Sequence, residues 1–315
     1  MNPIGAIDIG TNSTRLLVGQ PTGAGTFDVL DERLVITRLG KGVDATRQLA
    51  ADSIERTATA LADYAAIMQS HGVTQFRMTT TSAARDATNG GEFFAAARAA
   101  TGQEPEILSG HAEGQLSFAG ATQGFDPAAG PFLVVDIGGG STEFAWGTTT
   151  CDESVSLDIG AVRITERYLE SDPPKPEELH AAVSVVNLFL DDLDRDDPAW
   201  RAARTLVGVA GTITTMAAVE IGLMNYDRDA LHHYHLTHAA AEDVFRTLAT
   251  ESLADRRHNP GLDPARADVI VGGCVILCAI MRRLNANTCV VSQRDLLHAL
   301  ASSLCLGSST SPLAS

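Results

Sequence analysis

A duplicated α/β fold is predicted for this chain, and three observations support the prediction. Two segments read almost alike: Ala6 to Thr14 and Val134 to Glu143 each place an apolar run before an aspartate, a turn of glycine and hydroxyl residues, and a second apolar run. Each segment opens a series of three expected strands followed by alternating helices and strands. The chain has 315 residues, enough for two compact domains that each have a core.

The first half is expected to begin with three strands. Asp52 and Glu55 predict a capping box at the start of the first long helix, and Gly72 predicts its end. Ser109 is expected to cap a later helix that carries Glu113 in its first turn. The expected strands are Ile4–Asp8, Thr14–Gln20, Thr26–Thr37, Val73–Thr79 and Glu106–Leu108, with another helix after Gly91.

The pattern restarts after the turn at residues 124–127. This restart predicts a first domain of residues 1–125 with 295–315 and a second domain of residues 126–294, with a ligand cleft between them. The expected strands are Phe132–Asp136, Ser141–Gly147, Ser154–Leu157, Thr205–Val209 and Thr288–Val291. The expected helices are Ala161–Leu169, Pro176–Asp194, one from Thr214, Pro264–Leu284 and Arg294–Leu304.

Composition narrows the classes of function. A formal net charge of −16 argues against broad binding of nucleic acid or anionic membranes. A polyanionic ligand must therefore be held locally, by metal, backbone amides and a few arginines. The apolar run Val269–Met281 is too short to span a bilayer and is expected to be a buried helix. We expect no signal peptide and a cytoplasmic location.

The two repeated segments are each expected to form a β-hairpin with a phosphate-binding loop. Glycine allows close approach of a ligand to the main chain, and successive N–H groups in such a turn form a concave anion site. The aspartate at the base of each loop would repel phosphate unless a divalent cation, most simply Mg²⁺, lies between them. The alternative is that each turn merely reverses the chain. The residues assigned to phosphate are Gly10, Thr11, Asn12, Ser13, Gly138, Gly139, Gly140, Ser141 and Thr142.

The charged residues beside these loops supply the expected chemistry. Asp8, Asp136 and Glu143 are candidate metal ligands, and Asp136 with Glu143 is the stronger pair. Their alternative role is to cap N–H groups of the turns. Arg85 and Arg15 are expected to neutralise charge on the transferred group. For Arg85 the alternative is a surface ion pair with Asp86.

Four motifs together resemble the exopolyphosphatase/guanosine pentaphosphatase family. They are Asp8-Ile9-Gly10-Thr11-Asn12-Ser13, Thr81-Ser82-Ala83-Ala84-Arg85-Asp86-Ala87, Ser109-Gly110-x-x-Glu113-Gly114 and Asp136-Ile137-Gly138-Gly139-Gly140-Ser141-Thr142-Glu143. Arg266-Ala267-Asp268-Val269-Ile270 and the Gly211-Thr212 turn also match, so the similarity covers the whole chain. The resemblance implies a duplicated actin-like, ribonuclease-H-like fold whose C-terminal helix returns to the first domain.

The resemblance also implies roles for particular residues. Glu113 takes the place of the family's catalytic base, and a carboxylate that orients water is what phosphoanhydride hydrolysis requires. Gly211 and Thr212 occupy the place where the wider superfamily contacts a nucleotide or distal phosphates. The chain departs from the family in its closing segment, Gln293-Arg294-Asp295-Leu296-Leu297-His298, which lacks the Arg-Glu-Gly ending expected of many relatives.

The first hypothesis is therefore an Mg²⁺-dependent exopolyphosphatase that prefers short polyphosphates, with Mn²⁺ as a substitute metal and a homodimer as an open alternative. Hydrolysis of guanosine pentaphosphate is the second hypothesis. A sensor that binds guanosine penta- or tetraphosphate without turnover is the third, and an ATP-dependent kinase or chaperone ATPase of the same wider fold is the fourth. The histidines of residues 232–238 favour a loop or short edge strand over a zinc site, and the five cysteines favour small buried hydrophobes.

Overall fold

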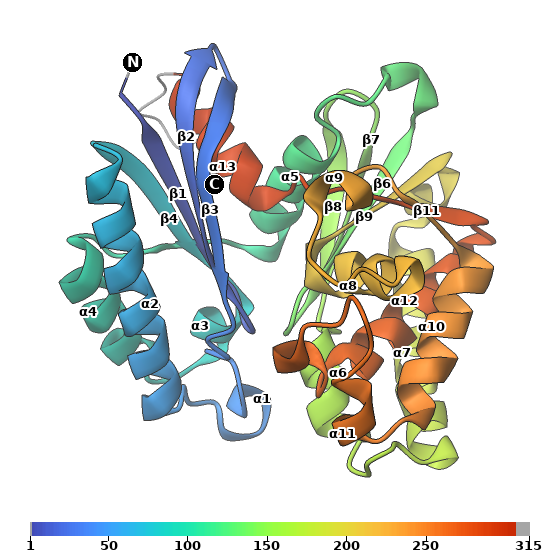
Figure 1. Ribbon diagram of the computed structural model, residues 1–315. Coiled ribbons are helices and arrows are strands. Elements are labelled where there is room, and N and C mark those ends of the chain that lie inside the picture. Colours follow the sequence, from blue (N-terminus) through green and yellow to red (C-terminus); the bar gives the residue numbers. More distant parts are fainter. Residues whose placement is uncertain (1, 307–315) are drawn as a thin grey trace. The chain divides into compact units, whose positions relative to one another are not determined.

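A computed structural model describes residues 2–306, and the chain divides into two compact units (Figure 1). Unit 1 holds described residues 2–116 and 296–306, and unit 2 holds residues 117–295. The border between the units falls within helix α5 (Gly110–Ala121). The domain borders expected from the sequence, at residues 125/126 and 294/295, stay a prediction.

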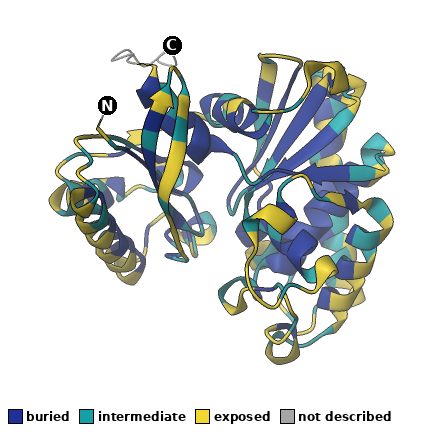
Figure 2. Cartoon of the chain, turned by 45° about the horizontal axis from the view of Figure 1, so that its top comes forward, coloured by how far each residue is buried: buried dark blue, intermediate teal, exposed yellow. Residues whose placement is uncertain are grey.

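Unit 1 contains a five-stranded mixed sheet in the order β3-β2-β1-β4-β5. Its central strand β1 (Ile4–Ile9) pairs antiparallel with β2 (Thr14–Gly23) and parallel with β4 (Gln75–Thr80). The edges are β3 (Thr26–Val35) and the short β5 (Glu106–Ile107). Most of β3 is exposed, whereas β1 is almost entirely buried (Figure 2).

Helices cover both faces of this sheet because successive side chains of β1 and β2 alternate between two apolar clusters. Ile7 and Ile9 face the cluster to which α2 (Ala51–Ser70) and α4 (Gly90–Thr101) contribute. Ile4 and Ala6 face α13 (Leu296–Cys305). The return of the C-terminal helix to the first sheet is therefore confirmed. The remaining short helices are α1 (Val43–Thr46) and α3 (Ser82–Asp86).

Unit 2 repeats this topology in its six-stranded sheet, ordered β10-β11-β9-β6-β7-β8. The strands β6 (Phe132–Ile137), β7 (Thr142–Gly147) and β8 (Cys151–Leu157) are antiparallel neighbours, and β9 (Thr205–Val209) runs parallel to β6. The order β8-β7-β6-β9 therefore matches β3-β2-β1-β4 of unit 1. The remaining strands are β11 (Thr288–Val291) and the edge strand β10 (His235–Thr237).

Alternation also explains how helices pack on the second sheet. Val135 and Ile137 belong to the larger cluster, which includes residues of α7 (Pro176–Asp196) and α12 (Ile270–Leu284). Val134 belongs to the opposite cluster, together with Phe118 and Ala121 of α5. The other helices are α6 (Ala161–Tyr168), α8 (Ala210–Ile221), α9 (Arg228–Leu231), α10 (His238–Thr250) and α11 (Leu253–Arg256), with 3₁₀ turns η1 (Pro127–Ala129), η2 (Pro198–Ala202) and η3 (Pro264–Arg266).

Three helix starts differ from the sequence-based expectations. Helix α2 begins at Ala51, with Ala50 as its N-cap and no side-chain cap, so Asp52 lies inside the first turn, where it accepts a hydrogen bond from Arg56 Nη1 at 2.7 Å. Helix α8 begins at Ala210, four residues before Thr214. The single helix expected at residues 264–284 is two elements, η3 and α12, since the chain leaves the helix at residues 267–269.

The apolar helices are core elements of unit 2. In the part of the chain that the structure describes, no helix has the length and apolar character needed to cross a bilayer.

None of the five cysteines forms a disulfide, and four of them are buried. Burial raises the pKa of Cys274 to about 12. These thiols therefore stay protonated at neutral pH, which agrees with a packing role.

Candidate functional site

The first hairpin loop turns its carbonyl oxygens toward a neighbouring segment of unit 1. Gly10 N donates to Ser13 O at 2.9 Å and closes the turn between β1 and β2. The carbonyl oxygens of Thr11 and Asn12 accept hydrogen bonds from the amides of Gly40 and Arg38, at 2.8 and 2.9 Å. The glycine and hydroxyl turn predicted from the sequence is thus held in place by three backbone hydrogen bonds.

The aspartate of this hairpin has a cationic neighbour. Asp8 lies directly opposite Arg15 in the β1–β2 register. Arg15 Nε is 3.7 Å from Asp8 Oδ2, and both side chains are mostly buried. The structure therefore brings together a residue predicted to bind metal and one predicted to bind phosphate. Their charges offset each other within the protein.

The second hairpin keeps the same turn but places two acids side by side. Gly138 N donates to Ser141 O at 3.0 Å, as Gly10 does to Ser13 in the first hairpin. Asp136 lies directly opposite Glu143 in the β6–β7 register. The Glu143 residue is only 1% exposed. Like charges directly opposite each other on a sheet are destabilising. The second hairpin therefore contains a repulsive pair where the first has an attractive one.

Two serine hydroxyls hold the acid pair in place. Ser117 Oγ, on α5, donates to Asp136 Oδ2 at 2.6 Å. Ser156 Oγ, on β8, donates to Glu143 Oε1 at 2.7 Å. Each bond fixes one oxygen of its carboxylate, and hydrogen bonds to a charged acceptor are among the stronger ones.

The donor set of this hairpin suits Mg²⁺. Two carboxylates and nearby hydroxyls are hard oxygen ligands, and Mg²⁺ is usually held by one or two carboxylates together with water and substrate phosphate. Within residues 2–306, no group of three or more histidine, cysteine, aspartate or glutamate side chains could hold a metal ion.

Not every hydroxyl of the two loops is available to a ligand. Thr142 Oγ1 donates to Ile159 O at 2.5 Å, and Thr142 is fully buried. Thr11 Oγ1 lies 2.9 Å from Ser82 Oγ, at the start of α3. Both hydroxyls anchor their loops to the surrounding protein, so a ligand would meet mainly the loop backbone.

Arg85 and the helix that carries Glu113 meet in unit 1. Arg85 Nη1 donates to Leu108 O at 3.1 Å, just before Ser109. Ser109 Oγ accepts from Ala112 N at 3.2 Å, so the expected cap of α5 is confirmed. The ion pair between Arg85 Nε and Asp86 is long, at 3.9 Å, and 33% of the arginine side chain is exposed. The alternative expected for Arg85 is therefore present in the structure, together with the bond to Leu108 O.

Glu113 lies in the first turn of α5, where its amide donates to Ser109 O at 2.9 Å. The positive end of the helix dipole favours a carboxylate at this position. Ser117, which binds Asp136, follows Glu113 by four residues and so lies on the same face of the helix.

The third glycine turn includes an arginine that the sequence reasoning gave no role. Ala210 starts α8 with a positive φ of 68°. A Cβ added to Gly211 would lie 1.5 Å from Arg266 Nη1, so only glycine leaves room for the guanidinium there. Arg266 belongs to one of the motifs that carry the resemblance, and this was the signal that could have identified it.

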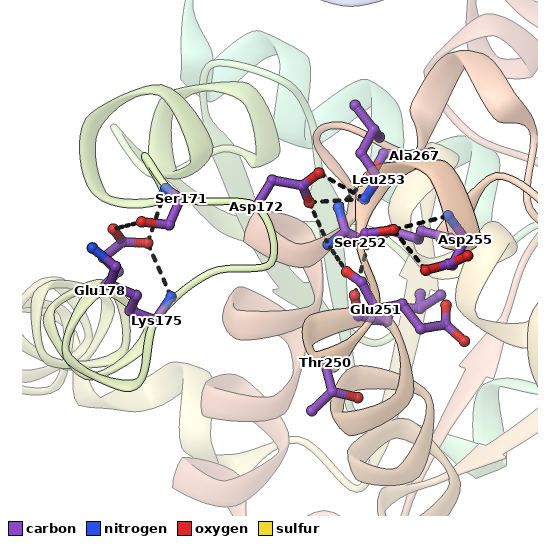
Figure 3. A network of polar contacts seen from close by, with 12 residues as sticks. Ser171, Asp172, Lys175, Glu178, Thr250, Glu251, Ser252, Leu253, Asp255 and Ala267 are labelled. Atoms are coloured by element: carbon purple, nitrogen blue, oxygen red, sulfur yellow. Dashed lines mark hydrogen bonds and ion pairs between the residues drawn. The ribbon is translucent and has the colours of Figure 1, made fainter.

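A buried arginine holds the segment that follows Arg266. Arg256 Nη1 donates to Ala267 O at 2.9 Å, and its other nitrogens bind the carbonyl oxygens of Leu248 and Glu251. Figure 3 shows the polar contacts around this segment, in which the N–H of Leu253 donates to both carboxylate oxygens of Asp172. Burial lowers the pKa of Arg256 from its ordinary value.

The histidine-rich segment forms a short edge strand and a turn, as one sequence-based alternative expected. The rings of His232 and His233 lie 3.9 Å apart, and His235 begins β10. Burial lowers the pKa of His233, with Arg294 and His235 as further causes. A cluster able to hold zinc is absent from the described residues.

Comparisons with known proteins agree with this geometry. A model of the Ppx/GppA phosphatase family matches residues 7–305. The chain is 40% identical over 313 residues to Exopolyphosphatase 2 of Mycobacterium tuberculosis, covering 96% of this chain and 98% of that protein.

Solved structures show the same likeness. The crystal structure of an exopolyphosphatase-like protein matches with a TM-score of 0.91 and 33% identity, covering 96% of this chain and 98% of that chain. A Ppx/GppA family member from Aquifex aeolicus matches with a TM-score of 0.81 and 30% identity, covering 98% and 99% of the two chains.

The repeated sheet topology and these matches confirm the duplicated α/β fold. The family match covers both hairpins, the helix of Glu113 and the turn beneath Arg266. On this evidence the chain belongs to the Ppx/GppA phosphatase family.

Proposed function

We propose that this protein is an exopolyphosphatase that releases terminal orthophosphate from inorganic polyphosphate. The observation that carries the proposal is the opposed Asp136–Glu143 pair beside a glycine loop. Two acids at that place repel a polyanion unless a divalent cation joins them to it. The named relative from Mycobacterium tuberculosis, at 40% identity over nearly the whole chain, supports the same activity.

The residues have separate roles in this proposal. Asp136 and Glu143 hold Mg²⁺, with Asp8 as a further ligand and Mn²⁺ as a substitute metal. When bound, the ion neutralises charge on the phosphate oxygens. Glu113 orients and deprotonates the attacking water, which needs a carboxylate within hydrogen-bond reach. Arg85 stabilises the charge that develops on the transferred group.

The backbone of the two hairpin loops binds phosphate groups of the chain, and Arg15, Gly211 and Thr212 contribute further contacts. We add Arg266 to this set, because its guanidinium lies over the glycine turn at the start of α8. Arginine presents a planar fork of donors that matches phosphate oxygens. A cytoplasmic location and a homodimer stay predictions.

Phosphate release tests the proposal directly. Purified protein is given tripolyphosphate, chains of several hundred units, and guanosine pentaphosphate, each with and without Mg²⁺. Mg²⁺-dependent release that is fastest per chain end on the short polyphosphate supports the proposal. Faster release from guanosine pentaphosphate would assign the second hypothesis, and binding of that nucleotide without any release would assign the sensor.

The role of Glu113 has its own variant. Glu113→Gln should lower kcat by about a thousandfold, within the range that a general base contributes, while tripolyphosphate still binds. Glu92→Gln is the matched control, because Glu92 is exposed in the first turn of α4. Near-normal turnover by Glu113→Gln would assign the base elsewhere.

A further inference from the structure

The glycine loop of the second hairpin has its carbonyl oxygens bound by the segment that follows β8. Ala161 N donates to Gly138 O at 2.9 Å, and Val162 N and Arg163 N both donate to Gly139 O, at 2.9 and 3.1 Å. These donors are the first amides of α6, which usually lack a partner within their own helix. The first turn of α6 is thus hydrogen-bonded to the carbonyl side of the loop.

A side chain completes this set of bonds. Arg163 Nε donates to Gly140 O at 2.7 Å, and the Arg163 residue is only 8% exposed. The carboxylate of Asp158, which is 66% exposed, lies 3.6 Å from Nη2. A buried charge is costly unless hydrogen bonds compensate it, and the bond to Gly140 O is one that compensates this guanidinium.

Peptide geometry fixes where the opposite side of the loop points. In a trans peptide the C=O and the following N–H point in opposite directions. The carbonyl groups of Gly138, Gly139 and Gly140 turn toward α6, so the N–H groups of Gly139, Gly140 and Ser141 turn away from it. Within residues 2–306, none of these three N–H groups donates a hydrogen bond to a main-chain oxygen. Three such neighbouring amides form an anion nest.

Close approach of the two segments depends on one further glycine. A Cβ added to Gly160 would lie 2.4 Å from Gly139 O. The contact between the loop and the start of α6 is therefore too close for any other residue at position 160. Arg163 extends this contact, because its Nε binds Gly140 O, the carbonyl oxygen of the last glycine in the loop.

We propose that Arg163 is a positioning residue for substrate phosphate. By binding Gly140 O it turns the Gly140–Ser141 peptide so that the Ser141 N–H joins the anion nest, and its buried charge polarises that peptide. Arg163 does not touch the substrate itself. The inference rests on the proposed function, in which this loop binds phosphate of a polyphosphate chain.

Steady-state kinetics of Arg163→Met and Arg163→Lys on tripolyphosphate test the inference. Loss of the bond should raise KM and the inhibition constant of orthophosphate at least tenfold in Arg163→Met, with a smaller rise in Arg163→Lys. The kcat of folded protein should change less than KM. Arg167→Met, an exposed arginine on the same helix, should keep the wild-type KM.

A purely structural role gives a different result. Partial unfolding removes active molecules, so it lowers kcat and the melting temperature and leaves KM unchanged. That pattern, or a wild-type KM in both folded variants, would overturn the inference. If Arg163→Met does not fold, the KM of Arg163→Lys decides, and a rise of threefold or more supports the role.

Binding separates this inference from the proposed function. Calorimetric titration of tripolyphosphate into Glu113→Gln and into the Glu113→Gln/Arg163→Met double variant should show at least tenfold weaker binding in the double variant. If the wild-type protein neither hydrolyses nor binds polyphosphate, the proposed function fails. If it does both and the double variant binds equally well, only the role of Arg163 fails.

Discussion

The two hairpins of this protein have the same backbone and opposite electrostatics. Asp8 and Asp136 occupy the same register position, and each loop closes with the same glycine-to-serine bond. The residue opposite the aspartate is Arg15 in the first hairpin and Glu143 in the second. The first hairpin therefore places opposite charges across its two strands, whereas the second places two carboxylates opposite each other. The two halves share the loop geometry and differ in the charges beside it.

The hairpins also differ in the group that donates a hydrogen bond to the third carbonyl of each loop. Asn12 O accepts from the backbone amide of Arg38, which has a positive φ of 53°. At the equivalent place, Gly140 O accepts from the Arg163 side chain. The bond to Asn12 O comes from a backbone amide, so it remains after most substitutions of Arg38. The bond to Gly140 O comes from the Arg163 side chain, so it is lost when that side chain is replaced. Mutational sensitivity should therefore concentrate in the second hairpin.

Among changes in the two hairpins, the largest expected effect follows from removing one charge of the acid pair. Glu143→Gln should lower kcat/KM at least a hundredfold, about 3 kcal/mol of transition-state stabilisation, and should weaken the Mg²⁺ dependence. In metal-free buffer the same change should raise the free energy of unfolding by about 0.5 kcal/mol, because two opposed carboxylates no longer repel each other. Phosphate release across a Mg²⁺ titration and urea unfolding measure the two effects.

The control for this variant is Glu153→Gln, an exposed residue of β8, which should change neither quantity. If Glu143→Gln is as active as the wild type at low Mg²⁺, the acid pair does not hold the metal. The contrast between the two hairpins would then have no catalytic meaning.

A smaller effect is expected at the equivalent position of the first hairpin. Arg15→Gln should lower kcat/KM about tenfold, in line with the loss of one charge-assisted hydrogen bond. The Mg²⁺ concentration at half-maximal rate should change less than in Glu143→Gln, because Asp8, the neighbour of Arg15, is only the further ligand of the proposed site. A larger shift than in Glu143→Gln would show that the first hairpin is the main metal site. The measurement is the same titration that is used for Glu143→Gln.

The smallest effect is expected at the backbone tie. Arg38→Gly keeps the amide that binds Asn12 O and suits the positive φ, so KM should change less than twofold and stability by at most about 1 kcal/mol in either direction. Chemical denaturation and steady-state kinetics measure both. A tenfold rise in KM would mean that the Arg38 side chain itself contacts substrate.

Local patterns were enough to predict the two hairpins. The apolar runs around Asp8 and Asp136 specify strands, and the glycine turns between them specify reversals. Ser109 was correctly expected to cap α5 because its capping bond is local. These features depend on residues only a few positions apart.

Features that depend on distant partners were missed or misplaced. The bond between Arg163 and Gly140 joins residues 23 positions apart, and the contact between Arg266 and Gly211 is longer still in sequence. Asp52 was expected to cap a helix, but Arg56 binds it instead. Periodicity cannot predict which of several available partners a side chain selects once the chain is folded.

Unit 1 is built from two stretches of chain, and this affects how the protein is made. The face of β1 and β2 that carries Ile4, Ala6 and Leu17 is covered by α13. A ribosome releases the two strands long before that helix, and the whole of unit 2 is synthesised in between. Until α13 is made, the only other buried residues of this cluster that can pack against the face are Leu108, Ala112 and Leu116. Unit 1 can therefore complete its core only after unit 2 has been synthesised.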